Sequence, residues 1–549
     1  MADTPSIVPS GSDGSDSPGG RGLAARLLNL VEMLGNKLPD PVTLFVIGAL
    51  LVPVVSHVAW AMDWEVAKIA AEQVDGQTVL VESEDKITAK PMLSRDEAFG
   101  MLAGLKDNFI GFAPLGVVLV GMLGIGVAEF TGLIGASLKA FMLITPKKLL
   151  TPAMVFVGVM SSAGMDAGYV VLPPVAALLY LSVGRSPLAG IAAVFAGVSA
   201  GFCANLAITG LDPMLSELSQ EGARLIDPEY TVVPQCNYYF AAFSTVFLTL
   251  VGWGVTAWFV EPRLNARSAE HGGPGAVLED HTEHQRLSAL EVRGLIWAAC
   301  ALTIFAVVLV LLIMVPCSFL HGKVPGAEEG KGLDRWVVAI VPLIFFAFLI
   351  PAMAYGIAAG TIRNDKDVAS MMGKAMAGMA PIIVLAFFAG QFIAWFKHSN
   401  LGEMLAITGG MQLAESGLPS WAVLVGFILL VSVLNLFVGS MSAKYTALAP
   451  IFIPMFMIGA GLSPELTQAA YRVGDSCTNI ITPLNAYLII ILVFVQKYDK
   501  KAGMGTMIAL MLPYSVVFLI TWTGLLLAWT TFDIPLGSGG PLEYVPPAG

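Results

Sequence analysis

Long apolar stretches alternate with short charged segments along almost the whole chain. Seven of these stretches have about the length that crosses a bilayer as a single helix, roughly 20 residues. They lie at about 41–62, 112–130, 238–260, 295–315, 336–357, 380–395 and 506–530. The strands of an outer-membrane barrel are shorter and alternate in polarity, so a barrel is excluded. The pattern therefore predicts an all-α, polytopic membrane protein.

Two further pairs of apolar stretches are each divided by small polar residues, at 161–168 and at 439–446. The halves of the first pair, 154–160 and 170–181, are too short to cross a hydrocarbon core of about 30 Å at a rise of about 1.5 Å per residue. Basic residues flank this pair on both sides, which favours the cytoplasm for both of its ends. We expect two re-entrant hairpins; the alternative for the first pair is one kinked span.

Two other spans carry polar residues in the middle. The first, about 187–219, loosens at 207–213, and the second, about 464–495, contains the polar stretch 471–483. A loosened helix is tolerated at membrane depth only where its backbone is buried in protein or lines a cavity. Both spans are therefore predicted to be broken helices.

The stretch 471–483 places Arg472, Asp475 and Pro483 between two apolar segments. Charged residues at that depth are costly, and they usually face a partner or a water-filled cavity. A glycine and a proline bracket the polar residues, which suggests that the helix is interrupted between them. We expect a substrate or ion site here. The alternative is a buried Arg472–Asp475 pair that only joins helices.

The same order of elements occurs twice. A span, an interfacial helix, a hairpin and a broken span follow one another in about 98–220 and again in about 366–496. Inverted-topology repeats with broken helices are typical of secondary transporters. Additional spans lie in 236–357 and 506–531. We therefore expect a single transporter domain over residues 21–549.

The expected topology has nine transmembrane helices and two hairpins. It places every cluster of Lys and Arg near a crossing in the cytoplasm, with the N-terminus inside and the C-terminus outside. Residues 1–20 are rich in Ser, Gly, Pro and Asp, a composition that predicts a disordered tail. Outside the membrane we expect a short strand at 78–81. Cys236 and Cys317 also fall outside, so a disulfide between them is a further hypothesis.

Composition supports the membrane class and excludes several functions. The chain is 56% hydrophobic and 13% charged, whereas a soluble protein has roughly 25% charged residues. The net charge is −11 and no basic patch occurs, so nucleic acid is not an expected partner. Five cysteines and six histidines show no metal-binding spacing. No GxxxxGK[ST] loop occurs, which disfavours ATP-driven transport.

The polar segments offer two kinds of ligand for a coupling ion. Hairpin tips and unwound helices present carbonyls, hydroxyls and amides, which suit a small cation such as Na⁺. The two predicted clusters are Ser161, Ser162 and Asn205, and Ser440, Ser442, Thr478 and Asn479. Candidate carriers of a cation or proton are Asp166, Asp212 and Asp475, because a carboxyl group in a low-dielectric site can titrate near neutral pH. The alternative is that the small polar residues only permit close helix packing.

Four other residues suit an aromatic, anionic substrate. The planar guanidinium of Arg472 fits a carboxylate or a sulfonyl-like anion. Tyr445 can stack on an aromatic ring and Asn435 can contact the substrate, although both can equally be packing residues. Lys444 can act as a gate or counter-ion, or can extend its amine to the membrane interface.

Several motifs resemble the p-aminobenzoyl-glutamate transporter (AbgT) family. They are Ser440-x-Ser-Ala-Lys-Tyr-x-x-Leu-Ala-Pro, Ser463-Pro-Glu-Leu-Thr-Gln-Ala-Ala-Tyr-Arg-Val-Gly-Asp-Ser, Thr478-Asn-Ile-Ile-Thr-Pro-Leu, Ser161-Ser-Ala-Gly-Met-Asp-Ala-Gly-Tyr and Thr209-Gly-Leu-Asp-Pro. The resemblance runs from the first span to the last. It implies an inner-membrane homodimer whose protomers have nine spans and two hairpins.

The resemblance also implies a function. Its substrates would be p-aminobenzoyl-glutamate, p-aminobenzoate and, in efflux, sulfonamides, with coupling to a Na⁺ or H⁺ gradient. The substrate-binding positions carried over are Asp212, Asn435, Ser442, Tyr445, Pro464, Arg472, Asp475 and Pro483. Na⁺ would be placed at Asn205, Asn435 and Asp475. The family commonly has Trp at the position of Tyr445, so stacking there is expected to be weaker or differently selective.

The sequence thus predicts an ion-coupled secondary transporter in a bacterial inner membrane, with no cofactor other than the coupling ion. An importer of dicarboxylates or other organic anions with a related fold is the alternative. A channel does not explain inverted repeats with unpaired acids. An intramembrane protease would need HExxH, a Ser–His pair or paired aspartates, and His57, the main intramembrane histidine, is far from the polar segments in sequence. Import and efflux are equally compatible with the pattern.

Overall fold

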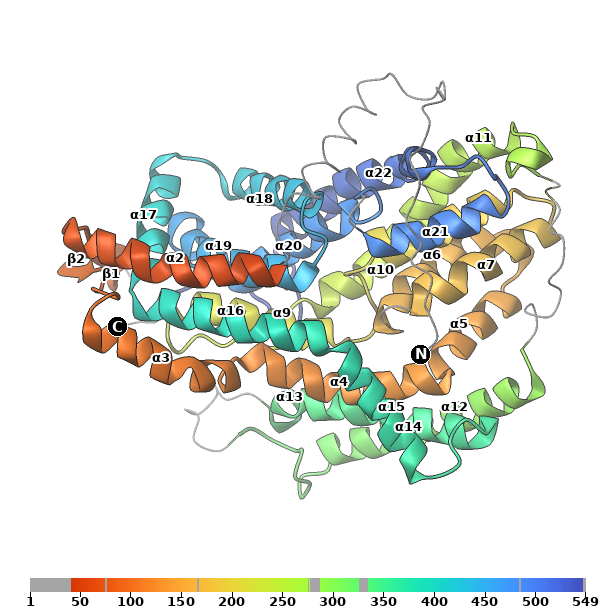
Figure 1. The fold of residues 1–549 in the computed structure, drawn as a ribbon, viewed down its shortest axis with the longest axis horizontal. Helices are drawn as coiled ribbons and strands as arrows, with labels where there is room; N and C mark the ends of the chain where they lie inside the picture. The colour runs from red at the N-terminus through yellow and green to blue at the C-terminus, as the bar shows by residue number, and fades with distance from the viewer. Residues whose placement is uncertain are drawn as a thin grey trace, which may run out of the picture.

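The computed structural model describes residues 41–74, 77–164, 167–274, 276, 287–324, 334–482 and 485–546. The predicted tail at 1–20, Asp166 and Pro483 lie outside these residues. The described part is built of helices and one antiparallel pair of strands, β1 (Glu65–Val74) and β2 (Gln77–Thr88) (Figure 1). The all-α class is confirmed, and the strand expected at 78–81 is part of β2.

Eight helical segments in the described part are long and apolar enough to cross a membrane. They are Val42–Ala61 in α2 (Pro41–Ala61), Arg95–Thr131 in α3 and α4, Tyr238–Asn265 in α10, η4 and α11, Ala289–Met314 (α12), Ile340–Ala359 (α14), Ala380–His398 (α16), Met441–Ala460 (α19) and Met504–Thr531 (α22). Each of the seven long apolar stretches of the sequence overlaps one of these segments. Helix α12 packs on α14 at the periphery and leaves most of its apolar side chains exposed, as expected of a helix that faces lipid or a partner.

The segment Arg95–Thr131 consists of α3 (Arg95–Ile110) and α4 (Ala113–Thr131), and the segment Tyr238–Asn265 consists of α10 (Tyr238–Val255), η4 (Thr256–Val260) and α11 (Glu261–Asn265). Shorter helices outside the eight segments include α5 (Leu133–Ile144), η1 (Lys147–Leu149), η5 (Ala269–His271), α13 (Arg335–Val338), α15 (Asp365–Gly378) and α17 (Leu401–Glu415). Helix α17 lies between α16 and the second hairpin, at the place in the second repeat where an interfacial helix is predicted, and its bounds are the predicted 401–415. The sequence pattern missed α15 because its 14 residues form no apolar run. A capping box between Asn364 and Asp367 starts this helix instead.

Both predicted hairpins are helix–turn–helix units. The first consists of α6 (Leu150–Met160), η2 (Ser161–Gly164) and α7 (Ala167–Ser182). The second consists of α18 (Ser420–Asn435) and α19. Its turn is shorter than the predicted tip at 439–446, because α19 begins at Met441. The Ser440 hydroxyl caps that helix by accepting a hydrogen bond from the backbone N–H of Ala443, so Lys444 and Tyr445 are helical.

Both predicted breaks occur. Helix α8 (Pro187–Phe195) runs into the π-turn η3 (Ala196–Ala200), and the chain is irregular until α9 (Leu211–Ala223). Helix α20 (Pro464–Thr478) is separated in the same way from α21 (Ala486–Gln496). Gly474, however, does not mark the break. It lies inside α20 where this helix crosses α18, and a Cβ there would come within 2.6 Å of the Ile428 carbonyl oxygen.

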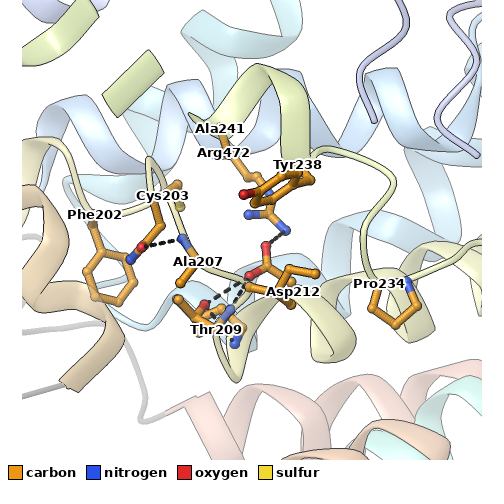
Figure 2. Close-up of a pocket in the computed structure, with 12 residues that line it drawn as sticks. Phe202, Cys203, Ala207, Thr209, Asp212, Pro234, Tyr238, Ala241 and Arg472 are labelled. Carbon is orange, nitrogen blue, oxygen red and sulfur yellow. Dashed lines mark hydrogen bonds and ion pairs between the residues drawn. The ribbon is translucent and has the colours of Figure 1, made fainter. Parts of the chain in front are cut away.

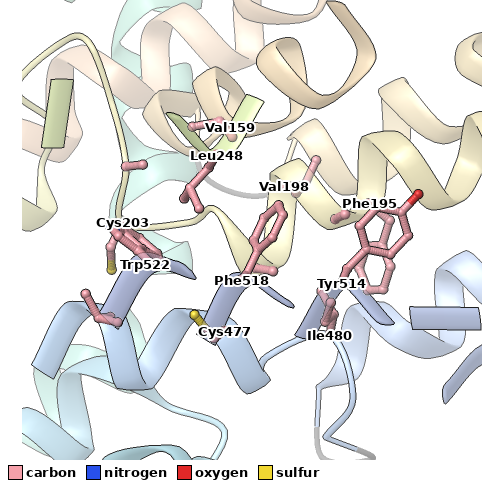
Figure 3. Close-up of a cluster of buried hydrophobic side chains, with 14 of the residues drawn as sticks. Val159, Phe195, Val198, Cys203, Leu248, Cys477, Ile480, Tyr514, Phe518 and Trp522 are labelled. Carbon is pink, nitrogen blue, oxygen red and sulfur yellow. The ribbon is translucent and has the colours of Figure 1, made fainter. Parts of the chain in front are cut away.

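The hairpins and broken helices meet in one large core together with α10 and α22. Figure 3 shows part of it, where Phe518 and Trp522 of α22 lie among Phe195, Leu248 and Cys477. The Trp522 indole N–H donates to Ser244 Oγ at 2.9 Å, which satisfies its polar atom inside the core. This packing fixes the positions of the two helix breaks relative to each other.

Helix α6 crosses the α8–η3 segment through two glycines. A Cβ on Gly158 would come within 2.4 Å of the Val194 carbonyl oxygen, and one on Gly197 within 2.2 Å of the Val155 carbonyl oxygen. Real Cβ atoms do not approach so closely, so the two backbones have to separate if either glycine is replaced. The crossing therefore places the first hairpin against the first broken helix.

We expect Gly197→Ala to destabilise the protein by about 1–3 kcal/mol, the usual cost of overpacking a core. The measurement is the midpoint of thermal unfolding in detergent. Gly524→Ala is the matched control, because Gly524 is also inside a long helix but a Cβ there meets nothing within 4 Å. Equal midpoints for the two variants would contradict this account of the crossing.

The C-terminal segment closes over the start of α20. The backbone N–H of Ser463 donates to Leu542 O at 3.1 Å, and the N–H of Tyr544 donates to Gly461 O at 2.9 Å. Beneath this segment Tyr230 donates to Glu465 Oε2 at 2.9 Å. Burial and the neighbouring Glu465 carboxylate raise the pKa of the Tyr230 phenol, so it remains a donor. The start of α20 is thus held in place by contacts with residues that are distant in sequence.

The disulfide hypothesis is wrong. Cys236 is buried and Cys317 is exposed, and both are free. The two cysteines therefore lie in different environments, which the expected topology alone could not distinguish.

Candidate functional site

Arg472 of α20 pairs with Asp212 of α9, so an ion pair joins the two broken helices. Arg472 Nη2 lies 2.7 Å from Asp212 Oδ1, and the arginine is only 4% exposed. The other carboxylate oxygen of Asp212 accepts from the backbone N–H of Thr209 at 2.7 Å and from its hydroxyl at 3.0 Å. Figure 2 shows the carboxylate between Thr209 and Arg472. The pair is therefore oriented by the irregular backbone that precedes α9.

Gln468 supports Arg472 from one turn earlier in α20. Its Oε1 accepts from Arg472 Nε at 3.2 Å and from Nη2 at 3.1 Å. Its amide nitrogen donates to Ser219 Oγ at 2.9 Å, and Ser219 is hydrogen-bonded to the Tyr445 hydroxyl at 2.6 Å. Tyr445 is completely buried, with its ring centroid 4.4 Å from that of Tyr471. Arg472 and Tyr445, predicted for the anionic and aromatic parts of a substrate, are thus connected through two residues that the prediction did not include, Gln468 and Ser219.

Asp475 pairs with Lys444 of α19. Lys444 Nζ lies 2.6 Å from Asp475 Oδ1, and the two side chains are 3% and 0% exposed. The same ammonium donates to Asn435 Oδ1 at the end of α18. The alternative interpretation of the sequence, a buried Arg472–Asp475 pair, is wrong: each of these charges pairs with a residue on a different helix.

Asn435 binds the end of α20 to the second hairpin. Its amide nitrogen, with two N–H donors, lies within hydrogen-bonding distance of three acceptors: Asp475 O at 2.5 Å, Thr478 Oγ1 at 2.9 Å and Asn479 Oδ1 at 2.9 Å. Asn479 is the C-cap of α20. One asparagine therefore satisfies several polar groups where the helix ends, as an irregular backbone at membrane depth requires.

The first hairpin has a simpler arrangement. Asn205, in the first helix break, donates to Ser162 Oγ at 2.8 Å, and its Oδ1 accepts from the backbone N–H of Ala207 at 3.0 Å. The Ser161 hydroxyl donates to Gly158 O at 2.6 Å. The predicted cluster of Ser161, Ser162 and Asn205 is therefore only partly assembled, because Ser161 bonds within its own hairpin.

A cavity of about 180 Å³ lies between the two hairpin turns and the first helix break. It is lined by Val118, Met122, Ile125, Ser162, Phe202, Thr209, Gly210, Leu211, Met214, Met379, Ile382, Met441 and Ser442. Most of these side chains are apolar, and the hydroxyls of Ser162, Thr209 and Ser442 come from three separate elements. A mostly apolar cavity with a few convergent polar groups is the usual form of a small-molecule site.

A second, narrower cleft lies on the other side of the same break. Asp212 and Arg472 line it together with Asn205 and Tyr238, and it has about 10 Å³ of free space, roughly the room for one water molecule. Figure 2 shows this cleft. Phe202, Thr209 and Leu211 border both spaces. The charged pair is therefore separated from the cavity by one irregular segment of backbone.

The structure sorts the predicted residues into three groups. Asp212 pairs with Arg472, which is linked to Tyr445 through Gln468 and Ser219. Asn435 contacts Asn479 directly and shares the Lys444 ammonium with Asp475. Ser442 lines the cavity, and Pro464 begins α20 two turns before Arg472. Gln468 could have been found from its spacing, because residues four apart on a helix lie on one face.

Comparisons with known proteins agree with this architecture. Residues 26–544 match the AbgT putative transporter family. The chain is 35% identical over 516 residues to the p-aminobenzoyl-glutamate transport protein of Escherichia coli (strain K12), covering 94% of this chain and 97% of that relative. A crystal structure of the YdaH transporter of Alcanivorax borkumensis, described as having an unusual topology, is 39% identical and superposes with a TM-score of 0.81, covering 91% of this chain and 100% of that one. The structure of MtrF of Neisseria gonorrhoeae, described as illuminating a class of antimetabolite efflux pumps, is 38% identical with a TM-score of 0.84, covering 94% of this chain and 100% of that one.

Proposed function

Because the chain belongs to the AbgT putative transporter family, we propose that it moves p-aminobenzoyl-glutamate and p-aminobenzoate-like compounds across a membrane, driven by a gradient of Na⁺ or H⁺. The observation that carries this proposal is the cavity between the two hairpin turns, beside buried charges on two broken helices. Apolar walls suit the aromatic ring, and Arg472 suits a substrate carboxylate. The same chemistry suits a sulfonamide, so we include efflux of sulfonamides in the proposal.

We assign roles to the residues accordingly. Arg472 would take the carboxylate of the substrate and Ser442 would contact the substrate in the cavity, with Asp212, Asn435, Tyr445, Pro464, Asp475 and Pro483 as the further substrate positions. Ser161, Ser162, Asp166, Asn205, Asp475 and Asn479 would serve the coupling ion. The sequence places Na⁺ at Asn205, Asn435 and Asp475 because these side chains offer oxygen ligands. In the structure, Asn435 and Asp475 instead contact the ammonium of Lys444.

The proposal extends to the assembly and its place in the cell. We propose a homodimer in a bacterial inner membrane, with nine crossings and two hairpins in each protomer. The N-terminus would be cytoplasmic and the C-terminus periplasmic, since this orientation leaves the Lys and Arg clusters near the crossings inside.

The test is reconstitution of the purified chain into liposomes, with a Na⁺ gradient or a pH gradient imposed separately. We expect saturable movement of labelled p-aminobenzoyl-glutamate under at least one gradient, and competition by a sulfonamide. Protein-free liposomes are the control. Flux that does not saturate and does not depend on a gradient would indicate a channel, and competition by succinate without any by p-aminobenzoyl-glutamate would favour the dicarboxylate importer.

A further inference from the structure

The buried charges around the helix breaks are already balanced before any ion or substrate binds. Two acids, Asp212 and Asp475, face two bases, Arg472 and Lys444, and each acid is paired at 2.7 Å or less. A metal cation added at Asp475 would make three cations for two acids in a region from which water is largely excluded. An unbalanced buried charge is strongly unfavourable.

Lys444 lies where a metal cation at the second hairpin would have to bind. Its ammonium contacts Asn435 Oδ1 and Asp475 Oδ1, one amide oxygen and one carboxylate oxygen, which are the ligand types that a small hard cation takes. The amide nitrogen of Asn435 is engaged by Asp475 O, Thr478 and Asn479. These contacts fix the orientation of the Asn435 side-chain amide, so that Oδ1 points toward the Lys444 ammonium.

The Lys444 ammonium is also covalently part of the same chain as the Asp475 carboxylate that it neutralises. Lys444 is on the first turns of α19, while its partners belong to the ends of α18 and α20. A group attached in this way competes with a dissolved ion at a high effective concentration. Sodium at ordinary concentrations must therefore displace a tethered competitor from both oxygens at once.

Resting on the proposed function, we propose that Lys444 is the resident cation of the Asn435–Asp475 site and takes the place of Na⁺ there. These oxygens consequently bind no Na⁺ while Lys444 is present, and removal of the amine turns them into a Na⁺ site. The second oxygen of Asp475 has no hydrogen-bond partner among the residues that the structure describes. This oxygen provides a further ligand for Na⁺ once Lys444 is removed.

The experiment measures equilibrium binding of radioactive Na⁺ to the purified chain in detergent, at constant ionic strength with choline as the replacing cation. We expect Lys444→Met to gain one saturable Na⁺ site, and Lys444→Met/Asp475→Asn to lose it. Lys444→Arg keeps the charge and should gain no site. Lys366→Met is the matched control, because this lysine is exposed on α15.

Two results would overturn the proposal. One is a folded Lys444→Met chain that binds no more Na⁺ than wild type. The other is a Na⁺ site in wild type that disappears in Lys444→Met/Asp475→Asn. This second comparison tests the proposal even if Lys444→Met does not fold. Because binding is measured without flux, the outcome is separate from the liposome test: loss of p-aminobenzoyl-glutamate transport would reject the proposed substrate and leave the Lys444 result standing.

Discussion

Arg472→Ala is expected to abolish transport, with a loss of at least about 100-fold in the initial rate. Arg472 is the buried cation that joins α20 to α9 through Asp212. Removing one partner of a buried ion pair costs about 3–5 kcal/mol because the other charge is left uncompensated, and each 1.4 kcal/mol corresponds to about tenfold in an equilibrium constant. The substrate would also lose its fork-shaped carboxylate ligand. The measurement is the uptake of labelled p-aminobenzoyl-glutamate into liposomes.

Asp212→Ala should give the same loss of transport, and we expect both variants still to assemble as the wild type does. Asp212 retains hydrogen bonds from Thr209 when the arginine is absent, and Gln468 retains its bond to Ser219. The variants should therefore elute at the wild-type position in size-exclusion chromatography. Transport at the wild-type rate by either variant would remove that residue from the site.

A charge-neutral double variant separates stability from function. Asp212→Asn/Arg472→Gln can keep a hydrogen bond between α9 and α20 without any buried charge. We expect its thermal midpoint to exceed that of Arg472→Ala, while transport stays absent. Recovery of transport together with stability would mean that the pair only joins helices. Arg363→Ala, at an exposed arginine, controls for loss of positive charge in general.

The second large effect is expected at the cavity. Ser442→Phe places a benzyl group in a space of about 180 Å³, and we expect at least about a tenfold loss of substrate affinity, equivalent to 1.4 kcal/mol. The physical reason is steric, because the new ring occupies the volume that the aromatic substrate needs. Binding is measured by titration calorimetry with p-aminobenzoyl-glutamate.

Ser442→Ala is the matched control for this change. It removes the Ser442 hydroxyl, which lies 3.3 Å from the Ser440 hydroxyl. It leaves the backbone carbonyl of Ser442, which accepts a hydrogen bond from the Thr446 hydroxyl. We expect this variant to retain most of the affinity. If alanine and phenylalanine reduce binding equally, the hydroxyl rather than the volume determines recognition, and the cavity is not the place of the ring.

The helical segments could be predicted from the sequence because they depend on local properties. Apolar length predicts a span, and polar residues within an apolar run predict a break, whatever the helix packs against. The breaks near 207–213 and before Pro483 were found in this way. The predicted tip at 439–446 is longer than the observed turn, because Ser440 caps α19 and the residues after it are helical.

Pairing between helices could not be predicted in the same way. Arg472 and Asp475 are three residues apart, so their partnership was the natural local hypothesis. In the structure one faces Asp212 and the other faces Lys444, because α9 and α19 bring opposite charges to different sides of α20. Gly474 is a second example. A glycine within a polar stretch suggests a helix break, but in the structure Gly474 permits the close crossing of α20 with the backbone carbonyl of Ile428 in α18.

The sequence by itself determined the membrane class, the order of the apolar segments and helix breaks along the chain, and the set of polar residues that interrupt them. These follow from the cost of placing polar groups in hydrocarbon, a cost that each segment bears independently. Only the tertiary structure decided which charges neutralise each other, which hydroxyls line the cavity and which amine is placed at Asp475. Those outcomes depend on how helices distant in sequence cross. Hydrogen bonds and ion pairs form only at interatomic distances near 3 Å, so the crossing decides which side chains become partners.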